Sequence, residues 1–497
     1  MKCLSANALA ALPDAVARPR YDRAALQPGI VHLGIGAFMR AHLAVATEAA
    51  IDADGDPRWG IVGVSLRHGD TRDALAPQDG LYTLALRDAD EAGRARQRLQ
   101  VIGCVLQVRV APEDPAAVLA AIAASATRIV SLSVTEKGYA HDPATRALNF
   151  GHPDIVHDLA HPDAPRSAAG FIVRGLARRR AAGLAPLTLL SLDNLPSNGH
   201  TLQGLVLAFA ERVDPALARW IADGCTFPNS MVDRIVPRTT ADDRRQVDAQ
   251  LSLRDAWPVI AEPFFDWAVE DRFAAGRPAW DRGGARFVAE AAPWETLKLR
   301  MVNGTHSAIA YLGATAGWHT VDVAIGQAAL HAFIEALMRD EIEPTLPALP
   351  GLDSAAYRTS LLARFANPAL AHRTQQIAMD GSQKLPQRLL GTVRDRLAKQ
   401  QPIARLGLAI ASWLHYLRGR DERGEPYPID DPLADDLVAL ARRAEALPDP
   451  RARTEMLTRY APVFGDLAGA PALVAAVAPA LESLRAQGVQ ATLETYR

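Results

Sequence analysis

The chain has 497 residues, of which 49% are hydrophobic and 22% charged, and its formal net charge is -2. A single hydrophobic core stops growing at roughly 250–300 residues, so this length predicts two large domains. The near-neutral charge argues against nucleic acid or an anionic membrane as the main partner and favours a small-molecule substrate.

The cysteines, Cys3, Cys104 and Cys225, lie far apart and form no CxxC pair. Neither a disulfide framework nor a structural zinc site is therefore expected. The N-terminus lacks the pattern of a signal peptide, and no window reaches about 18 uninterrupted apolar residues. We expect a cytoplasmic protein without membrane association, either a monomer or a small homo-oligomer.

The first predicted element is a strand that leads through two glycines into a helix. The apolar run at 29–33 is followed by Gly-Ile-Gly-Ala-Phe-Met-Arg, and an Ala-rich helical pattern continues to Ala50. This arrangement resembles the dinucleotide fingerprint GxGxxG, in which glycines let the backbone approach a pyrophosphate, although Met39 replaces the third glycine. Arg40 is expected either to contact a phosphate or ribose or to lie in a solvated first turn. The expected cofactor contacts in this segment are Gly34, Ile35, Gly36, Ala37, Phe38 and Arg40.

Further along the chain, strand and helix patterns alternate before giving way to helices. Apolar runs at 59–65, 128–134 and 187–192 predict strands, and the patterns at 115–126 and 168–182 predict helices. This alternation is typical of an α/β fold with a doubly wound parallel sheet of Rossmann type. After about residue 285, Ala/Leu periodicity predicts helices at 321–338, 402–417, 432–447 and 470–486. We expect a Rossmann-type domain over residues 1–285 and a mainly helical domain over 286–497, with ligand bound where they meet.

Polar residues follow the predicted strands. Arg67 and Asp70 follow the strand at 59–65, where an acidic residue normally holds the ribose of NAD. No acid stands at the immediate strand end, so Arg67 is a candidate to stack on adenine or contact a 2′-phosphate. NAD is expected, and NADP stays open. Glu136 and Lys137 follow the strand at 128–134, where loops approach the nicotinamide, and Lys137 is read either as a cofactor contact or as part of a turn with Gly138.

Two later segments combine polar and aromatic residues. Asn194 follows the strand at 187–192, and Asp233 lies in the string FPNSMVDR. The Asn194 amide either faces a substrate oxygen or forms a turn before proline. Asp233 is a candidate substrate contact or a packing residue between the domains.

The run from Lys298 to His306 carries an amine, a carboxamide and an imidazole, the groups that a metal-free alcohol dehydrogenase needs. In an α-helix with about 100° per residue, Glu295, Lys298, Asn303 and His306 fall within an arc of about 140°. The alternative interpretation is a solvated Glu295–Lys298 pair followed by a turn at Asn303.

Near residue 380 the chain concentrates cations and amides between apolar residues. Arg373 and Lys384 are the candidate partners there for substrate hydroxyls or a carboxylate. The alternative is an exposed, charged helix end.

Eight strings in order resemble the polyol-specific long-chain dehydrogenase family, also called the mannitol dehydrogenase family. They are GxGAFxRAH, GVSLR, VTEKGY, SLDN, FPNSMVDR, EPFFDW, KLRMVNGTHS and DGSQKLP, from about Gly29 to Arg388. The resemblance implies a Rossmann-type domain, a mostly helical second domain, a nicotinamide cofactor and no catalytic metal. It also implies oxidation of a secondary alcohol of a sugar alcohol or sugar acid to a ketone.

The resemblance also implies roles for individual residues. Lys298 would be the general base, Asn194 and Asn303 would hold the reacting oxygen, and His306 would orient the substrate. An amine that is desolvated beside a cationic nicotinamide loses its proton more easily and then accepts the alcohol proton. Glu295 and Glu136 would pass that proton to water.

Within this resemblance, the Ser-Leu-Arg and DGSQKLPQR strings are closer to fructuronate reductases (D-mannonate oxidoreductases) than to mannitol 2-dehydrogenases. A sugar-acid substrate needs a cation for its carboxylate, and Arg373, Lys384 or Arg388 would supply it. One alternative is a mannitol 2-dehydrogenase or another polyol dehydrogenase that acts on D-mannitol or D-arabinitol. Another is a non-catalytic dinucleotide-binding protein, and a third, a zinc-dependent alcohol dehydrogenase, is disfavoured because no cysteine lies in a ligand cluster.

Overall fold

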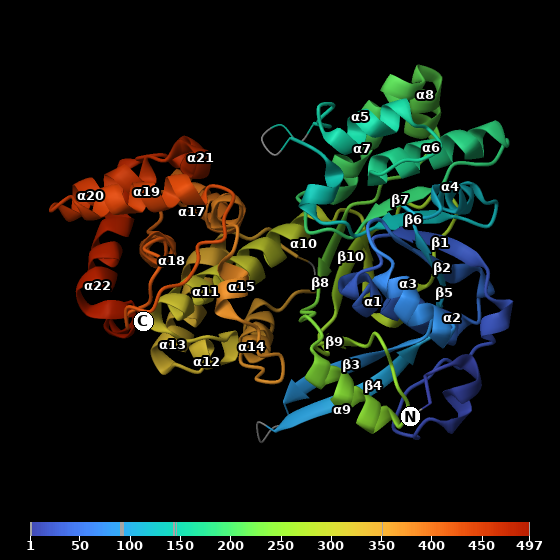
Figure 1. Ribbon diagram of the computed structural model, residues 1–497. Helices are drawn as coiled ribbons and strands as arrows, with labels where there is room; N and C mark the ends of the chain where they lie inside the picture. The colour runs from blue at the N-terminus through green and yellow to red at the C-terminus, as the bar shows by residue number, and fades with distance from the viewer. Residues whose placement is uncertain (1, 90–93, 143–144, 146, 350, 497) are drawn as a thin grey trace. The chain divides into compact units, whose positions relative to one another are not determined.

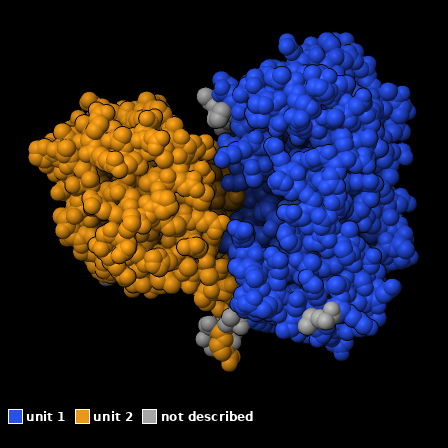
Figure 2. Space-filling model, in the orientation of Figure 1, with its two compact units in different colours: residues 1–88, 95–292 blue, residues 89–94, 293–497 orange. Residues whose placement is uncertain are grey.

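The computed structural model describes residues 2–89, 94–142, 145, 147–349 and 351–496. The chain divides into two compact units, coloured separately in Figure 2: unit 1 comprises Met1–Asp88 and Ala95–Ala292, and unit 2 comprises Ala89–Arg94 and Pro293–Arg497. The sequence predicts a boundary near residue 285. In the structure that residue begins strand β11 (Ala285–Val288), which pairs with β10 (Asp266–Glu270) and so keeps the following residues in unit 1.

Unit 1 is built on a five-stranded sheet in the order β5-β2-β1-β6-β7 (Figure 1). Every neighbouring pair in it is parallel, which confirms the predicted fold class. The strands are β1 (Pro28–Leu33), β2 (Gly60–Ser65), β5 (Val105–Val110), β6 (Ile129–Leu132) and β7 (Thr188–Ser191). The sequence patterns do not predict β5, because Gln107 and Arg109 interrupt its apolar residues.

Both faces of this sheet are buried. Successive side chains of a strand point to opposite faces, and along β1 Val31 and Leu33 belong to one apolar core while Ile30 belongs to another. The helices of the first core are α4 (Pro115–Ala123), α5 (Pro153–Ala160), α6 (Ala168–Ala181), α7 (Asn198–Val213) and α8 (Pro215–Gly224). The second core includes residues of α1 (Ala37–Ala41), α2 (Leu43–Asp54) and α3 (Asp70–Leu75).

Two smaller sheets, β11-β10-β8 and β4-β3-β9, complete unit 1. Their remaining strands are β3 (Tyr82–Ala89), β4 (Ala95–Ile102), β8 (Ser230–Asp233) and β9 (Val259–Ala261), and α9 is Ala241–Leu251.

Unit 2 is mainly helical, as the sequence predicts. The expected helix over 321–338 is broken after Ile325, and the last helix continues to Thr495 with a non-helical residue at Gly488. The helices are α10 (Ala292–Leu297), α11 (Thr305–Ala316), α12 (Val321–Ile325), α13 (Ala328–Ala336), α14 (Ser354–Phe365), α15 (Thr374–Ala378), α16 (Gly381–Leu385), α17 (Gly391–Ala398), α18 (Ala404–Tyr416), α19 (Ala434–Glu445), α20 (Pro450–Thr458), α21 (Ala461–Phe464) and α22 (Pro471–Thr495). Among the residues that the structure describes, no helix is both long and apolar enough to cross a membrane.

The segment from Lys298 to Gly304 winds as a π-helix, and so do Leu337–Ile342 and Pro386–Leu390. The prediction of a regular α-helix through Lys298 is therefore wrong. A π-helix bonds i to i+5, which widens the turn, so the 100° spacing does not hold there. Such turns occur frequently at functional sites.

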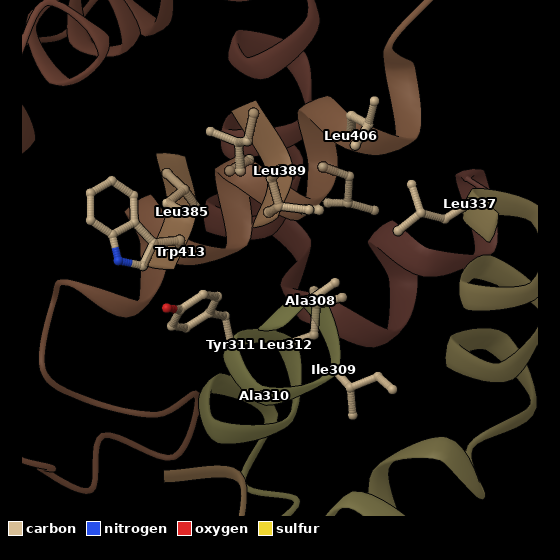
Figure 3. Close-up of a cluster of buried hydrophobic side chains, with 14 of the residues drawn as sticks. Ala308, Ile309, Ala310, Tyr311, Leu312, Leu337, Leu385, Leu389, Leu406 and Trp413 are labelled. Carbon is tan, nitrogen blue, oxygen red and sulfur yellow. The ribbon is translucent and has the colours of Figure 1, made fainter. Parts of the chain in front are cut away.

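The core of unit 2 surrounds α11 and α18. Figure 3 shows Tyr311 and Leu312 of α11 close to Trp413 and Leu406 of α18 and to Leu389, and all five are almost fully buried.

Replacing Leu312 by alanine should lower the free energy of unfolding by about 2–5 kcal/mol, because the deletion leaves a cavity in a close-packed core. Urea unfolding followed by circular dichroism measures this change. Leu433→Ala is the matched control, and its cost should be smaller because that side chain is only partly buried. Equal costs for the two variants would contradict this view of the core.

Candidate functional site

A cavity of about 480 Å³ opens in unit 1 beside the carboxyl ends of β1, β2 and β6. The strand order reverses between β1 and β6, and ligands of open parallel sheets bind at such a switch point. The lining residues come from the loops after these strands, from the starts of α3, α5 and α6 and from one distant tryptophan. They are Gly34, Ile35, Gly36, Ser65, Leu66, Arg67, His68, Asp70, Thr71, Ser133, Val134, Thr135, Lys137, Gly138, Ala140, His152, Asp154, Arg166, Ser167, Ala168 and Trp257.

The two predicted glycines have different roles in the cavity wall. Gly34 has φ +94°, and a Cβ there would lie 2.3 Å from the carbonyl oxygen of Ser133, so only glycine fits. A Cβ on Gly36 would meet only the carbonyl oxygen of Gly34, at 3.8 Å, which is an ordinary van der Waals contact, so this position is not crowded. The missing side chain at Gly36 leaves room for a ligand to approach the backbone, as a pyrophosphate requires.

Six of the predicted cofactor residues line this cavity: Gly34, Ile35, Gly36, Arg67, Asp70 and Lys137. Ala37 and Phe38 are not among the lining residues and form the first turn of α1. The Phe38 ring stacks on His42 at 5.0 Å. Met39, which stands where the fingerprint has its third glycine, is fully buried in the second core.

The structure corrects the expectation for Arg40. Its side chain is buried and is not among the cavity-lining residues, because the guanidinium donates to the carbonyl of Trp257 at 2.6 Å and lies over the Tyr82 ring. A longer bond of 3.4 Å reaches the carbonyl of Gly36. Both carbonyls belong to residues that line the cavity. Arg40 therefore holds the backbone of the cavity wall in place and is not itself positioned to contact a phosphate.

Arg67 and Asp70 lie at the end of the cavity next to β2. Arg67 Nη2 is 3.3 Å from a carboxylate oxygen of Asp154, and Asp70 is the first residue of α3. The charge of Arg67 is therefore partly balanced by Asp154, a residue that sequence reasoning missed.

Asn194 lies in the turn between β7 and α7, where its side chain is exposed. Asn198 anchors this turn: its Nδ2 donates to the carbonyls of Asp193 at 3.1 Å and of Ser230 at 2.8 Å, and its Oδ1 accepts from the Ser230 amide at 2.9 Å. Asn198 is therefore a structural residue that fixes the turn carrying the exposed Asn194.

The other unit 1 candidates occupy different surroundings. Glu136 is largely exposed, and its Oε1 lies 3.9 Å from Nε2 of His141. Asp233 is buried at the end of β8, opposite Asp266 of β10.

In unit 2, Lys298 and Asn303 both lie on the first π-helical turn, and their side chains are 9% and 8% exposed. Asn303 Nδ2 is buried and has no hydrogen-bond partner among the described residues. A buried donor without a partner is costly in a folded protein and calls for an explanation. Glu295 lies one turn earlier, half-buried in α10.

Two π-helical turns of unit 2 pack against each other at this point. Arg388 of the turn Pro386–Leu390 donates to Ser307 Oγ at 3.0 Å and to the Asn303 carbonyl at 3.4 Å. A Cβ on Gly304 would lie 2.8 Å from the Arg388 carbonyl, so the absence of a side chain permits this close packing.

His306 lies among cationic side chains. Its ring stacks on Phe365 and meets His372 edge-on, each at 5.2 Å between ring centres, and Nε2 is buried with no partner in the described part of unit 2. Burial lowers the pKa of His306 well below its ordinary value, and His372, Arg388, Arg364 and Lys384 lower it further. The imidazole is therefore neutral, with a nitrogen available to a ligand.

Lys384 is held by the carbonyls of Ile377 at 3.3 Å and Met379 at 2.5 Å. Burial, followed by the charge of Arg388, lowers its pKa to about 8. Arg373 is exposed at the start of α15. Within the described ranges, no three His, Cys, Asp or Glu side chains are placed to share a metal ion.

The comparisons with known proteins cover almost the whole chain. Residues 28–282 match the family model of the mannitol dehydrogenase Rossmann domain, and residues 290–485 match that of the mannitol dehydrogenase C-terminal domain. The D-mannonate oxidoreductase of Escherichia coli is 45% identical over 84% of this chain and 86% of its own length. The uncharacterized oxidoreductase YeiQ of the same organism is 42% identical over 98% of both chains. The crystal structure of Pseudomonas fluorescens mannitol 2-dehydrogenase, a ternary complex with NAD and D-mannitol, superposes with a TM-score of 0.88 at 36% identity, covering 100% of this chain and 99% of that one.

We expect the His306 imidazole to stay neutral throughout the range of pH 5 to 8 in which histidines ordinarily titrate. Its ¹⁵N chemical shifts, assigned by comparison with His306→Gln, measure the protonation state. A titration centred near the ordinary value would contradict the lowered pKa.

Proposed function

This chain belongs to the mannitol dehydrogenase family of oxidoreductases, and on that premise we propose that it interconverts D-mannonate and D-fructuronate with NAD as cofactor. The reaction converts a secondary alcohol of a sugar acid to a ketone. Lys298 acts as the general base in place of a metal ion.

The observation that carries this proposal is the π-helical turn of unit 2. It places the nearly buried amine of Lys298 and the unpartnered carboxamide nitrogen of Asn303 on one short segment. A neutral amine accepts the proton of the substrate alcohol, and a carboxamide NH₂ stabilises the negative charge that grows on the oxygen. One such donor contributes about 2.7–4 kcal/mol in comparable sites.

The other candidate residues complete the proposed mechanism. Asn194 of unit 1 donates a second amide hydrogen bond to the reacting oxygen. The neutral His306 orients a substrate hydroxyl through Nε2, and Asp233 is a further substrate contact. Glu295 and Glu136 carry the released proton to water.

The cavity of unit 1 supports a nicotinamide dinucleotide as cofactor, because its glycines and its place at the strand switch point fit a pyrophosphate. When bound, the nicotinamide ring takes up or gives back the hydride of the reaction. NAD is favoured over NADP because the charge of Arg67 is partly balanced by Asp154 and because Asp70 lines the wall, where its carboxylate would repel a 2′-phosphate. The related mannitol 2-dehydrogenase was crystallised with NAD.

The cationic cluster of unit 2 favours a sugar acid as substrate. Lys384, Arg388 and Arg364 all lie near His306, and a carboxylate is the natural partner of such cations. The exposed Arg373 is a further candidate for this carboxylate. The alternative substrates are neutral polyols, D-mannitol or D-arabinitol, and the relative crystallised with D-mannitol supports them.

Lys298→Ala should keep the affinity of the wild type for NADH but lose about 10²–10⁴-fold in kcat, because it removes the general base. Fluorescence titration measures the affinity, and the nicotinamide absorbance measures turnover. The exposed Lys399 gives the matched control, and Lys399→Ala should turn over normally. If the wild type binds NADH but turns over no polyol or sugar acid, that result would instead support a non-catalytic dinucleotide-binding protein. A bound zinc ion found by metal analysis would support a zinc-dependent enzyme.

With NADH, the protein should reduce fructuronate with a kcat/KM well above that for fructose. Lys384 carries its charge below its pKa of about 8, so the KM for fructuronate should rise as the pH rises through that value. The KM for fructose, which has no carboxylate, should not follow this curve, and Lys384→Ala should abolish it. A higher kcat/KM for fructose would overturn the choice of substrate.

A further inference from the structure

A buried carboxylate outside the proposed catalytic set joins the loops that follow two neighbouring strands. Asp193, two residues after the end of β7, is 8% exposed. Its carboxylate accepts hydrogen bonds from the amide of Val134 at 3.0 Å, the amide of Thr135 at 2.9 Å and the hydroxyl of Tyr139 at 2.8 Å. All three donors follow β6.

The loop that Asp193 holds is strained. Thr135 has φ +63° and ψ +165°, a conformation that is almost restricted to glycine and is especially unfavourable for a β-branched side chain. A residue stays in such a conformation only when its surroundings hold it there. Val134 and Thr135 both line the cavity, so this strained conformation shapes its wall.

Asp193 is itself held in place by a residue of β7. Ser191 Oγ lies 2.6 Å from the hydroxyl of Tyr139 and accepts from the amide of Asp193 at 3.2 Å. Burial raises the pKa of the Asp193 carboxyl, and its three hydrogen bonds oppose that rise. The next residue in the chain is Asn194, so the same anchor fixes the start of the turn that carries this amide.

We propose that Asp193 is a positioning residue, which holds the Thr135 turn in its strained conformation and thereby preforms the wall of the cofactor cavity. The inference rests on the proposed function, because it assigns the cavity to a nicotinamide dinucleotide. Asp193 itself touches neither cofactor nor substrate, and it acts through Val134, Thr135 and Asn194.

The test is a double-mutant experiment on the full-length protein. In Asp193→Asn one carboxylate oxygen becomes an NH₂ group, and in either orientation that group faces the amide of Val134 or Thr135, which then has no acceptor. The Kd for NADH, measured by fluorescence titration, should rise about tenfold or more, equivalent to the loss of one hydrogen bond. Glycine adopts the Thr135 conformation without strain, so adding Thr135→Gly to Asp193→Asn should return the Kd to within about threefold of the wild type.

Glu48 provides a matched control. It is also buried, its Oε2 accepts from the amides of Gly103 and Cys104 and from the hydroxyl of Tyr21, and it does not line the cavity. Glu48→Gln should leave the Kd for NADH unchanged. If Asp193→Asn behaves in the same way, or if glycine at position 135 does not restore binding, Asp193 has only a structural role and the proposal is overturned.

Hydrogen exchange of the Val134 and Thr135 amides gives a readout that needs no cofactor. Both amides should lose protection in Asp193→Asn, and unchanged protection would overturn the proposal. A wild-type protein that binds neither NADH nor NADPH would overturn the proposed function itself, whereas normal binding by Asp193→Asn would overturn only the role of Asp193.

Discussion

The close approach of two backbone segments at the centre of the parallel sheet is the constraint on which unit 1 depends. Ser133 bridges the ends of β1 and β6: its amide donates to the Leu33 carbonyl at 3.0 Å, and its hydroxyl donates to the Gly34 carbonyl at 3.1 Å. The Ser133 carbonyl fills the space that a side chain of Gly34 would need. Gly34 has a positive φ, with which the chain turns away from β1. This turn leaves the switch point of the sheet open, and the loops after β2 and β6 and the start of α6 line the space that results.

Unit 2 buries polar groups that have no hydrogen-bond partner beside an apolar core, among the residues that the structure describes. A buried polar atom without a hydrogen-bond partner costs about 1–3 kcal/mol, and Asn303 Nδ2 and His306 Nε2 are both in this condition among the described residues. The wide π-helical turn and its packing against Arg388 hold Asn303 and the nearby His306 in place despite this cost in stability. Such an arrangement is expected where a ligand supplies the missing partners, and the neighbouring cations set the charge that this ligand should carry.

The sequence predicts those parts of the molecule that depend on neighbouring residues. Nearly continuous apolar runs mark β1, β2, β6 and β7, and the glycine pair marks the turn after β1. Features that depend on distant residues are not predicted. The local sequence makes Arg40 a candidate phosphate contact, but in the structure its guanidinium donates to the carbonyl of Trp257, far along the chain. No local pattern links Trp257 or Arg166 to the cavity. The π-helical turn is also missed, because helical periodicity assumes 100° per residue. Lys298, Asn303 and Asn194 are linked only by the order of the eight strings along the chain, not by any local pattern.

The bonds between the Asp193 carboxylate and the loop after β6 make two segments, which the sequence separates by about sixty residues, into one structural part. A homologue in which only one of these loops is replaced would combine residue 193 with a turn that does not fit it. Engineering that transplants loops between relatives should therefore move residues 133–139 together with 191–198, and natural variation at Thr135 is expected to be coupled to the identity of residue 193.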